Sequence, residues 1–213
     1  MKLKQFSRIL TIVAGAMLAQ SIPAKAEVTN SAENGFTVRH QTEIAADPET
    51  VWKALIAPSR YWNPDHSWTG NADSLYLVPQ AGGCFCELIR TKTDDNIRSS
   101  DGSVQHMRVI FAHNNKVLRL SGALGPLQSE AVTGTLTMQI QPLGENSLVR
   151  FTYKVGGYME LPVDQIRPAV DGVIGEQLKR LNALFVKEKA QEESDTSPDE
   201  SSEAGEGEAE KSE

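Results

Sequence analysis

The stretch LPVDQIRPAVDGVIGEQLKRLNALFV, residues 161–186, decides the fold. Its apolar residues recur at steps of three and four, which is the period of a helix with one broad apolar face: Ile166, Val170, Val173, Ile174, Leu178, Leu181, Leu184 and Phe185. Gly172 and Gly175 project to the back of this helix, and each weakens it by about 1 kcal/mol relative to alanine. We therefore predict a long helix that is held by packing against another surface.

The chain before this helix is mostly strand-like. Residues 35–45 alternate between apolar and polar side chains, as in a half-buried strand. Further strands are expected at 75–78, 84–90, 104–113, 117–121, 132–141 and 148–155. Short connections between them predict an antiparallel meander with one face covered and one face in water.

Two short helices are expected after the first strand. Asp47 and Pro48 form an N-cap followed by proline at the first helical position, so a short helix should begin there and bury Val51, Trp52 and Leu55. A further turn is expected at 59–62. The sequence thus predicts an α+β fold in which a curved antiparallel sheet of about six to seven strands wraps on a long C-terminal helix.

This order of elements is that of the helix-grip fold, and the sequence resembles the START-like or SRPBCC superfamily in local motifs as well. The passage at 44–52 (IAADPETVW) looks like the superfamily's strand-to-helix opening. The segments at 82–87 (GGCFCE), 122–128 (GALGPLQ) and 170–173 (VDGV) look like the bacterial branch of polyketide cyclases and chaperone-ATPase activators. The resemblance covers residues 36–186 and implies a cavity between sheet and helix, used for lipids, hormones, polyketides or catalysis. It supplies no catalytic residues to transfer.

Candidate ligand-binding residues follow from that expected cavity. His40 lies on the apolar side of its strand, and Leu124 and Leu127 sit in a glycine- and proline-rich loop that is either a hairpin connection or a gate. The full set of expected cavity residues is His40, Met107, Phe111, Leu124, Leu127, Met138, Phe151, Tyr153, Gln177 and Leu181. His106 is expected on the side of its strand opposite Met107, in a structural role.

Gln177 falls in the middle of the helix's apolar face, between Val173, Leu181 and Leu184. An amide there must find hydrogen bonds or cost about 1–3 kcal/mol. Either the protein itself satisfies this amide, through Tyr153 or a backbone carbonyl, or the amide faces a cavity that holds water or ligand.

The two ends differ from the body. Residues 1–26 combine a basic start, ten apolar residues and a small-residue cleavage site, which predicts a secretory signal peptide. Residues 190–213 hold ten acidic residues against Lys211, and this composition predicts a disordered acidic tail. Between them we expect an N-terminal lead at 27–35 and one domain at 36–189, close to neutral in charge.

The cysteines, Cys84 and Cys86, alternate on one expected strand and therefore share a face. Two buried thiols are favoured over a disulfide, because two strand residues span about 6.6 Å, near the upper limit for bridged Cα atoms. A disulfide would need a bulge, which Gly82 and Gly83 could permit. A zinc or copper(I) site with His66 and His106 is a third alternative, although the spacing matches no known zinc pattern.

The leading functional expectation is a protein exported across the inner membrane, in the periplasm, that binds or carries a small hydrophobic molecule of lipid or polyketide type. The alternative is a cyclase- or dehydratase-type enzyme using His40, Tyr153 and Gln177. Chaperone activation is disfavoured by export, and nucleic-acid binding by the absence of a basic patch. No metal, cofactor or stable membrane insertion is expected. The ligand, the redox state of the cysteines, the tail's role and the oligomeric state stay open.

Overall fold

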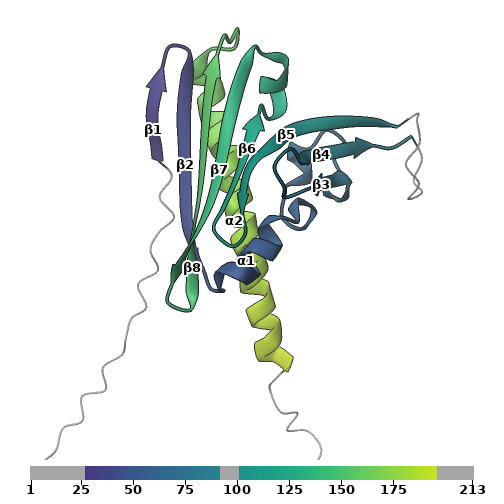
Figure 1. Ribbon diagram of the computed structural model, residues 1–213, viewed down its shortest axis with the longest axis vertical. Coiled ribbons are helices and arrows are strands. Elements are labelled where there is room, and N and C mark those ends of the chain that lie inside the picture. The colour runs from purple at the N-terminus through teal and green to yellow at the C-terminus, as the bar shows by residue number, and fades with distance from the viewer. Residues whose placement is uncertain (1–26, 92–100, 196–213) are drawn as a thin grey trace, which may run out of the picture.

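One antiparallel sheet curves around a long helix. The computed structural model describes residues 27–91 and 101–195. Eight strands follow the order β1-β2-β8-β7-β6-β5-β4-β3, and α2 runs along one face of this sheet with α1 near one end (Figure 1). The arrangement confirms the predicted α+β helix-grip architecture.

Of the elements, strands β3 to β8 follow one another in a meander, and β8 then pairs with β2. The bounds of all the elements are β1 (Glu27–Ala32), β2 (Gly35–Ile44), α1 (Pro48–Leu55), η1 (Pro58–Arg60), η2 (Pro64–His66), η3 (Ala72–Ser74), β3 (Leu75–Leu77), β4 (Cys84–Ile89), β5 (Gly102–His113), β6 (Val117–Gly122), η4 (Gly125–Ser129), β7 (Val132–Leu143), β8 (Asn146–Gly157) and α2 (Val163–Asp195). Asp47 caps α1 as predicted, because its side chain accepts the backbone N–H groups of Glu49 and Thr50.

Both ends of the domain extend further than expected. Residues 27–32 of the expected lead form β1, an edge strand paired with β2, so the sheet has eight strands rather than six to seven. At the other end α2 continues to Asp195, so residues 190–195 of the expected tail are helical. The expected signal peptide at 1–26 and the tail beyond 195 lie outside the described residues.

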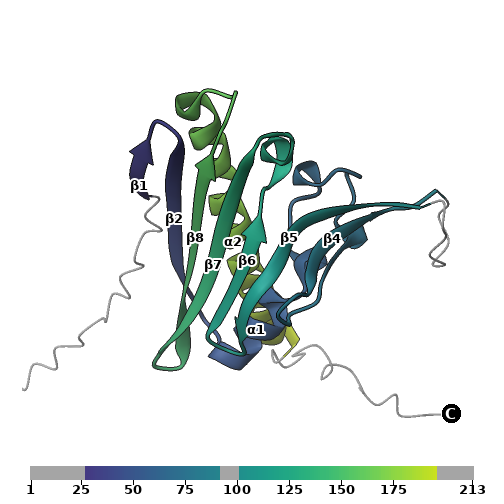
Figure 2. The same cartoon turned by 45° about the horizontal axis from the view of Figure 1, so that its top comes forward.

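Strand β5 contains two bulges that change which side chains face the core. Phe85 of β4 pairs with Met107 and Cys86 pairs with Gln105, so His106 is the extra residue. Val109 and Phe111 pair with Leu120 and Arg119 of β6, which leaves Ile110 extra. A bulge opposes two residues to one and breaks the alternation of faces. Figure 2 shows β5 and β4 running together toward one edge of the curved sheet.

The helix packs against the sheet chiefly through β2. Its buried residues Val170, Ile174, Leu178, Leu181 and Phe185 are the apolar face that the sequence predicted. Gly175 does not lie at the back as expected, since a Cβ there would stand 2.7 Å from Cε1 of His40. Glycine at this position lets the imidazole ring rest on the helix backbone.

Candidate functional site

A cavity of about 330 Å³ opens between the N-terminal half of α2 and two loops. The helix contributes Ile166, Ala169, Val170, Val173 and Ile174. The opposite walls come from residues 62–68, from the loop at 124–126 and from His106 of β5. The walls are mostly apolar and carry a few polar groups, and this combination is typical of small-molecule sites, whose volumes start near 300 Å³.

The segment at 62–69 forms one wall, and hydrogen bonds hold it at both ends. At its start, Asn63 donates its backbone N–H to Oε1 of Gln177 (2.8 Å) and its amide to Oε1 of Glu176 (2.7 Å). At its end, the backbone N–H groups of Trp68 and Thr69 donate to the two carboxylate oxygens of Glu87, at 3.0 and 2.6 Å. The segment therefore bridges α2 and β4, and this wall of the cavity is preformed.

Gln177 is the central anchor of this bridge. It is fully buried, its Oε1 accepts the Asn63 N–H, and its Nε2 lies 3.0 Å from Nδ1 of His66. Since an amide NH₂ can only donate, His66 accepts through Nδ1. Gln177 is thus satisfied by the protein itself, although by the 62–69 segment rather than by Tyr153, and it does not line the cavity.

Replacing Gln177 by leucine should lower the free energy of unfolding by about 1–3 kcal/mol, because the Asn63 N–H loses its acceptor in a buried place. Urea unfolding of the variant measures this loss. Lys179→Leu, at an exposed position of the same helix, is the matched control and should change stability by less than about 0.5 kcal/mol. Unchanged stability of Gln177→Leu would contradict the anchoring role.

The loop at 124–128 forms the wall beside the strands. Leu124 and Leu127 are buried, and Leu124 borders the cavity. Gln128 connects this loop to two other parts of the chain: its Oε1 accepts the indole N–H of Trp68 at 3.1 Å, and its Nε2 donates to the carbonyl of Gln105 in β5 at 3.0 Å. The loop is thus tied to the 62–69 wall and to β5.

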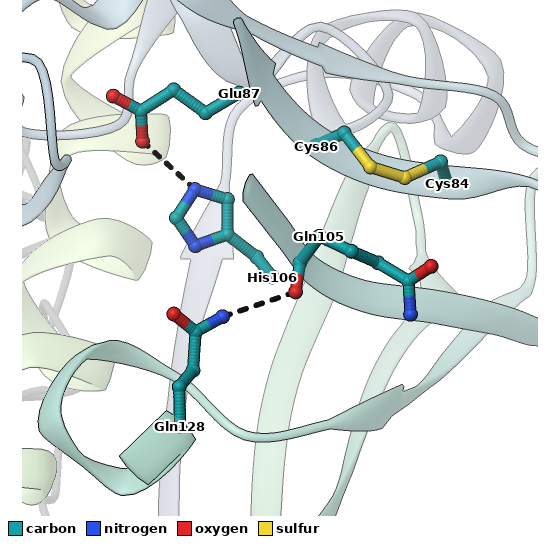
Figure 3. The surroundings of a disulfide bond; sticks show 6 residues. All are labelled: Cys84, Cys86, Glu87, Gln105, His106 and Gln128. Carbon is teal, nitrogen blue, oxygen red and sulfur yellow. Dashed lines mark hydrogen bonds and ion pairs between the residues drawn. A yellow bond between two sulfur atoms is a disulfide. The ribbon is translucent and has the colours of Figure 1, made fainter. Parts of the chain in front are cut away.

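A buried carboxylate–imidazole pair lies at the base of the site (Figure 3). Oε2 of Glu87 is 2.9 Å from Nε2 of His106, and the two residues are 0% and 4% exposed. The bulge in β5 allows His106 and Met107 to be buried in succession, so His106 lines the cavity instead of pointing to the opposite side as expected. The ring centroid of Phe85 lies 5.1 Å from that of His106.

The pKa values of both partners are shifted downward. Burial alone would raise the pKa of Glu87, but hydrogen bonds from Thr69, Trp68 and His106 outweigh it and leave the pKa lowered. Burial lowers the pKa of His106, and the nearby Glu87 only partly offsets this. At neutral pH the pair is therefore an ionised carboxylate and a neutral imidazole.

The cysteines beside this pair are joined, contrary to the preference for free thiols. Cys84 and Cys86 form a disulfide with their Cα atoms 5.4 Å apart (Figure 3). This separation is shorter than that of an extended strand, and the irregularity of the β4–β5 ladder lies at Phe85 and Cys86. Their sulfurs are thus not thiolate ligands, and within residues 27–91 and 101–195 no cluster of three or more His, Cys, Asp or Glu could hold a metal ion.

The structure distributes the ten expected cavity residues over three environments. Leu124 lines the cavity. Phe111 is 44% exposed beneath the guanidinium of Arg119, because the bulge at Ile110 turns it outward. Of the others, His40 bonds Asp171 at 2.8 Å, and the rest are buried without lining the cavity: Met107, Leu127, Met138, Phe151, Tyr153, Gln177 and Leu181.

Tyr153 is one of these buried residues, and it belongs to the hydrophobic core and does not line the cavity. Its hydroxyl donates to the carbonyl of Gly122 at 3.4 Å, and burial raises its pKa above the ordinary value. The aromatic and imidazole side chains that do line the cavity are Trp62, His66, Trp68 and His106. The sequence placed Trp62 in a helical turn and Trp68 in a loop without a role, and it considered His66 only as a metal ligand in the third alternative for the cysteines. The concentration of aromatic and histidine residues in that segment was the available signal.

No family model matches this sequence, and no curated protein does. Solved structures do match. An uncharacterised protein from Rhizobium leguminosarum is 18% identical with a TM-score of 0.50, covering 78% of this chain and 99% of that one. The Ara h 8.0201 protein is 9% identical with a TM-score of 0.49, over 72% and 99% of the two chains. A norcoclaurine synthase from Thalictrum flavum, a point mutant in complex with a transition-state analogue, is 13% identical with a TM-score of 0.48, over 75% and 99%.

The sheet order and the long C-terminal helix define a helix-grip fold, and the match to the Rhizobium protein shows the same fold in a solved structure. Within the described part of the chain, no helix has the length and apolar character needed to cross a membrane.

Proposed function

We propose that this protein binds a small hydrophobic molecule in the cavity between α2, the 62–69 segment and the 124–126 loop. The observation that carries the proposal is the cavity itself, which measures about 330 Å³, has mostly apolar walls and is fixed by hydrogen bonds that the 62–69 segment donates to Gln177, Glu87 and Gln128. A preformed site loses less entropy on binding than one that must be ordered by its ligand. The volume suits a compact ligand such as a small polyketide or a short lipid.

We further propose that the protein acts after export, as a carrier or binder in the periplasm. The signal-peptide pattern of residues 1–26 is the main support. The Cys84–Cys86 disulfide supports the same proposal, because structural disulfides persist in oxidising compartments.

Filling the cavity tests the binding proposal. Ala169 lies on the rim of the cavity on the exposed side of α2, so Ala169→Phe adds a ring there without removing a core side chain. The uncharged fluorescent probe N-phenyl-1-naphthylamine should bind the wild type, and its affinity should fall about tenfold or more in Ala169→Phe. Circular dichroism should show both proteins equally folded.

Lys179→Phe is the matched control, since it adds the same ring on the same helix outside the cavity. It should leave probe affinity within about twofold. Equal loss in both variants, or no probe binding to the wild type, would overturn the proposal.

An enzyme acting on such a ligand is the second candidate, and one observation favours it. Glu87 and His106 form a buried pair at the cavity, as in sites where a carboxylate orients an imidazole for proton transfer. This pair replaces His40, Tyr153 and Gln177 as the candidate acid–base group. Turnover of a polyketide-type substrate that is lost in His106→Phe but retained in His40→Gln would establish this candidate.

A further inference from the structure

We propose that His106 recognises a hydroxyl group of the ligand by accepting its hydrogen bond through Nδ1. The inference rests on the proposed binding function and narrows the ligand to hydrophobic molecules that carry a hydroxyl donor, such as phenols and enols. Three features of the site lead to it: the tautomer of His106, the position of Nδ1 and the pairing of the other polar groups in the lining.

Glu87 fixes the tautomer of His106. Its carboxylate already accepts the backbone N–H groups of Trp68 and Thr69, an arrangement that favours the ionised form. An ionised carboxylate can only accept hydrogen bonds, so Nε2 of His106, 2.9 Å away, must carry the proton and donate it. In a neutral ring the proton on Nε2 leaves Nδ1 with a lone pair. The lowered pKa of His106 is consistent with that neutral ring.

Nδ1 is open to the cavity. It lies on the side of the ring away from Glu87 (Figure 3), and no residue in the described ranges donates to it. The fully buried side-chain nitrogens without a partner in the described chain are Nε of Arg39 and Nε of Arg167. Nδ1 of His106 also has no hydrogen-bond partner, but it is not fully buried. Because the ring lines the cavity, we infer that Nδ1 is reached from the cavity.

Most of the other polar groups in the lining are already used. The indole N–H of Trp62 donates to the carbonyl of His66, that of Trp68 donates to Gln128, and the hydroxyl of Ser67 donates to Pro64. His66 accepts from Gln177 through Nδ1, which leaves its Nε2–H as a donor at a partly exposed position. Among the buried side chains of the lining, the acceptor left without a partner is therefore Nδ1 of His106, whereas the Asp65 carboxylate of the lining is exposed.

This acceptor selects among ligand classes. A carboxylate or phosphate would meet a lone pair at Nδ1 and the negative charge of Glu87 behind it, so anionic head groups are disfavoured. A purely hydrocarbon ligand would shield Nδ1 from water and offer it no hydrogen bond. Binding such a ligand would therefore include the cost of desolvating Nδ1. A hydroxyl group is complementary to this site.

The inference can be tested with 2-naphthol and 2-methoxynaphthalene, which share an aromatic body and differ in the hydroxyl donor. Isothermal titration calorimetry should show that the wild type binds 2-naphthol about tenfold or more tightly than the ether, as one added buried hydrogen bond predicts. His106→Phe should reduce that preference to within about twofold. His113→Phe, an exposed histidine of the same strand, is the matched control and should keep the wild-type preference.

Two results separate the inference from the proposed function. Equal affinity of the wild type for both compounds would overturn hydroxyl recognition while supporting the cavity as a binding site. No binding of either compound would overturn both.

Nitrogen-15 spectra of the unaltered protein give a second measurement that does not depend on a variant that folds. They should show His106 with Nε2 protonated and Nδ1 unprotonated, and the Nδ1 resonance should move when 2-naphthol binds but not when the ether binds. A protonated Nδ1 in the free protein would overturn the inference.

Discussion

Glu87→Leu should lower the free energy of unfolding by at least about 3 kcal/mol. Glu87 is the common acceptor for three donors, the backbone N–H groups of Trp68 and Thr69 and Nε2–H of His106. Leucine fills a similar volume but accepts no hydrogen bond. The bond to His106 is buried and the two backbone bonds are part-buried. A buried donor that loses its acceptor costs about 1–3 kcal/mol and a part-buried one about 1 kcal/mol, so the three together exceed most single substitutions.

Urea unfolding at neutral pH measures this loss, and two other variants locate its cause. Glu49→Leu, at an exposed glutamate on α1, should change stability by less than about 1 kcal/mol. Glu87→Gln should fall between the two, because its amide keeps one acceptor oxygen and places a donor where a second acceptor is needed. A Glu87→Leu protein as stable as the wild type would show that water satisfies the three donors.

The hydrogen bonds that hold the 62–69 segment explain how this fold builds a defined site. Glu87 from β4, Gln177 from α2 and Gln128 from η4 each hold the 62–69 segment by hydrogen bonds to its backbone or side chains. Within the described residues the segment pairs with no strand, so its position depends on these three side chains together with Glu176, which accepts the Asn63 amide. The cavity wall is therefore determined by residues that do not themselves touch the cavity.

The fold could be predicted because its signals are local. The period of residues 161–186 and the alternation in β7 and β8 follow from side chains that must face one core. The edge strand β1 was missed because EVTNSA lacks apolar alternation and is a strand only through its pairing with β2.

The site was less predictable because it depends on interruptions of those patterns. Strict alternation along β5 places Phe111 with Met107 on the inner face and His106 on the outer face. The bulges at His106 and Ile110 reverse both assignments, and neither bulge is marked by a glycine in the strand. Gln177 was recognised as an amide in need of partners, but its partners lie more than 100 positions away, in a loop without periodicity.

Phe85→Ala should destabilise the protein by about 3–5 kcal/mol, the usual cost of removing a buried aromatic ring. Phe85 is 3% exposed, and its ring centroid lies 5.0 Å from that of Trp62, edge-on, and 5.1 Å from that of His106. It also borders a small pocket of about 10 Å³ that Met138 lines as well. The ring therefore supports two cavity residues from behind, and its loss should leave an apolar hole beneath them.

That hole gives the prediction a second readout. Apolar cavities created in protein cores stay dry and take up benzene, so benzene should raise the thermal midpoint of Phe85→Ala more than that of the wild type. Phe111→Ala makes the same chemical change at an exposed position of β5, and it should cost less than about 1 kcal/mol and respond to benzene as the wild type does. Equal stability losses in the two variants would show that Phe85 does not support the base of the cavity.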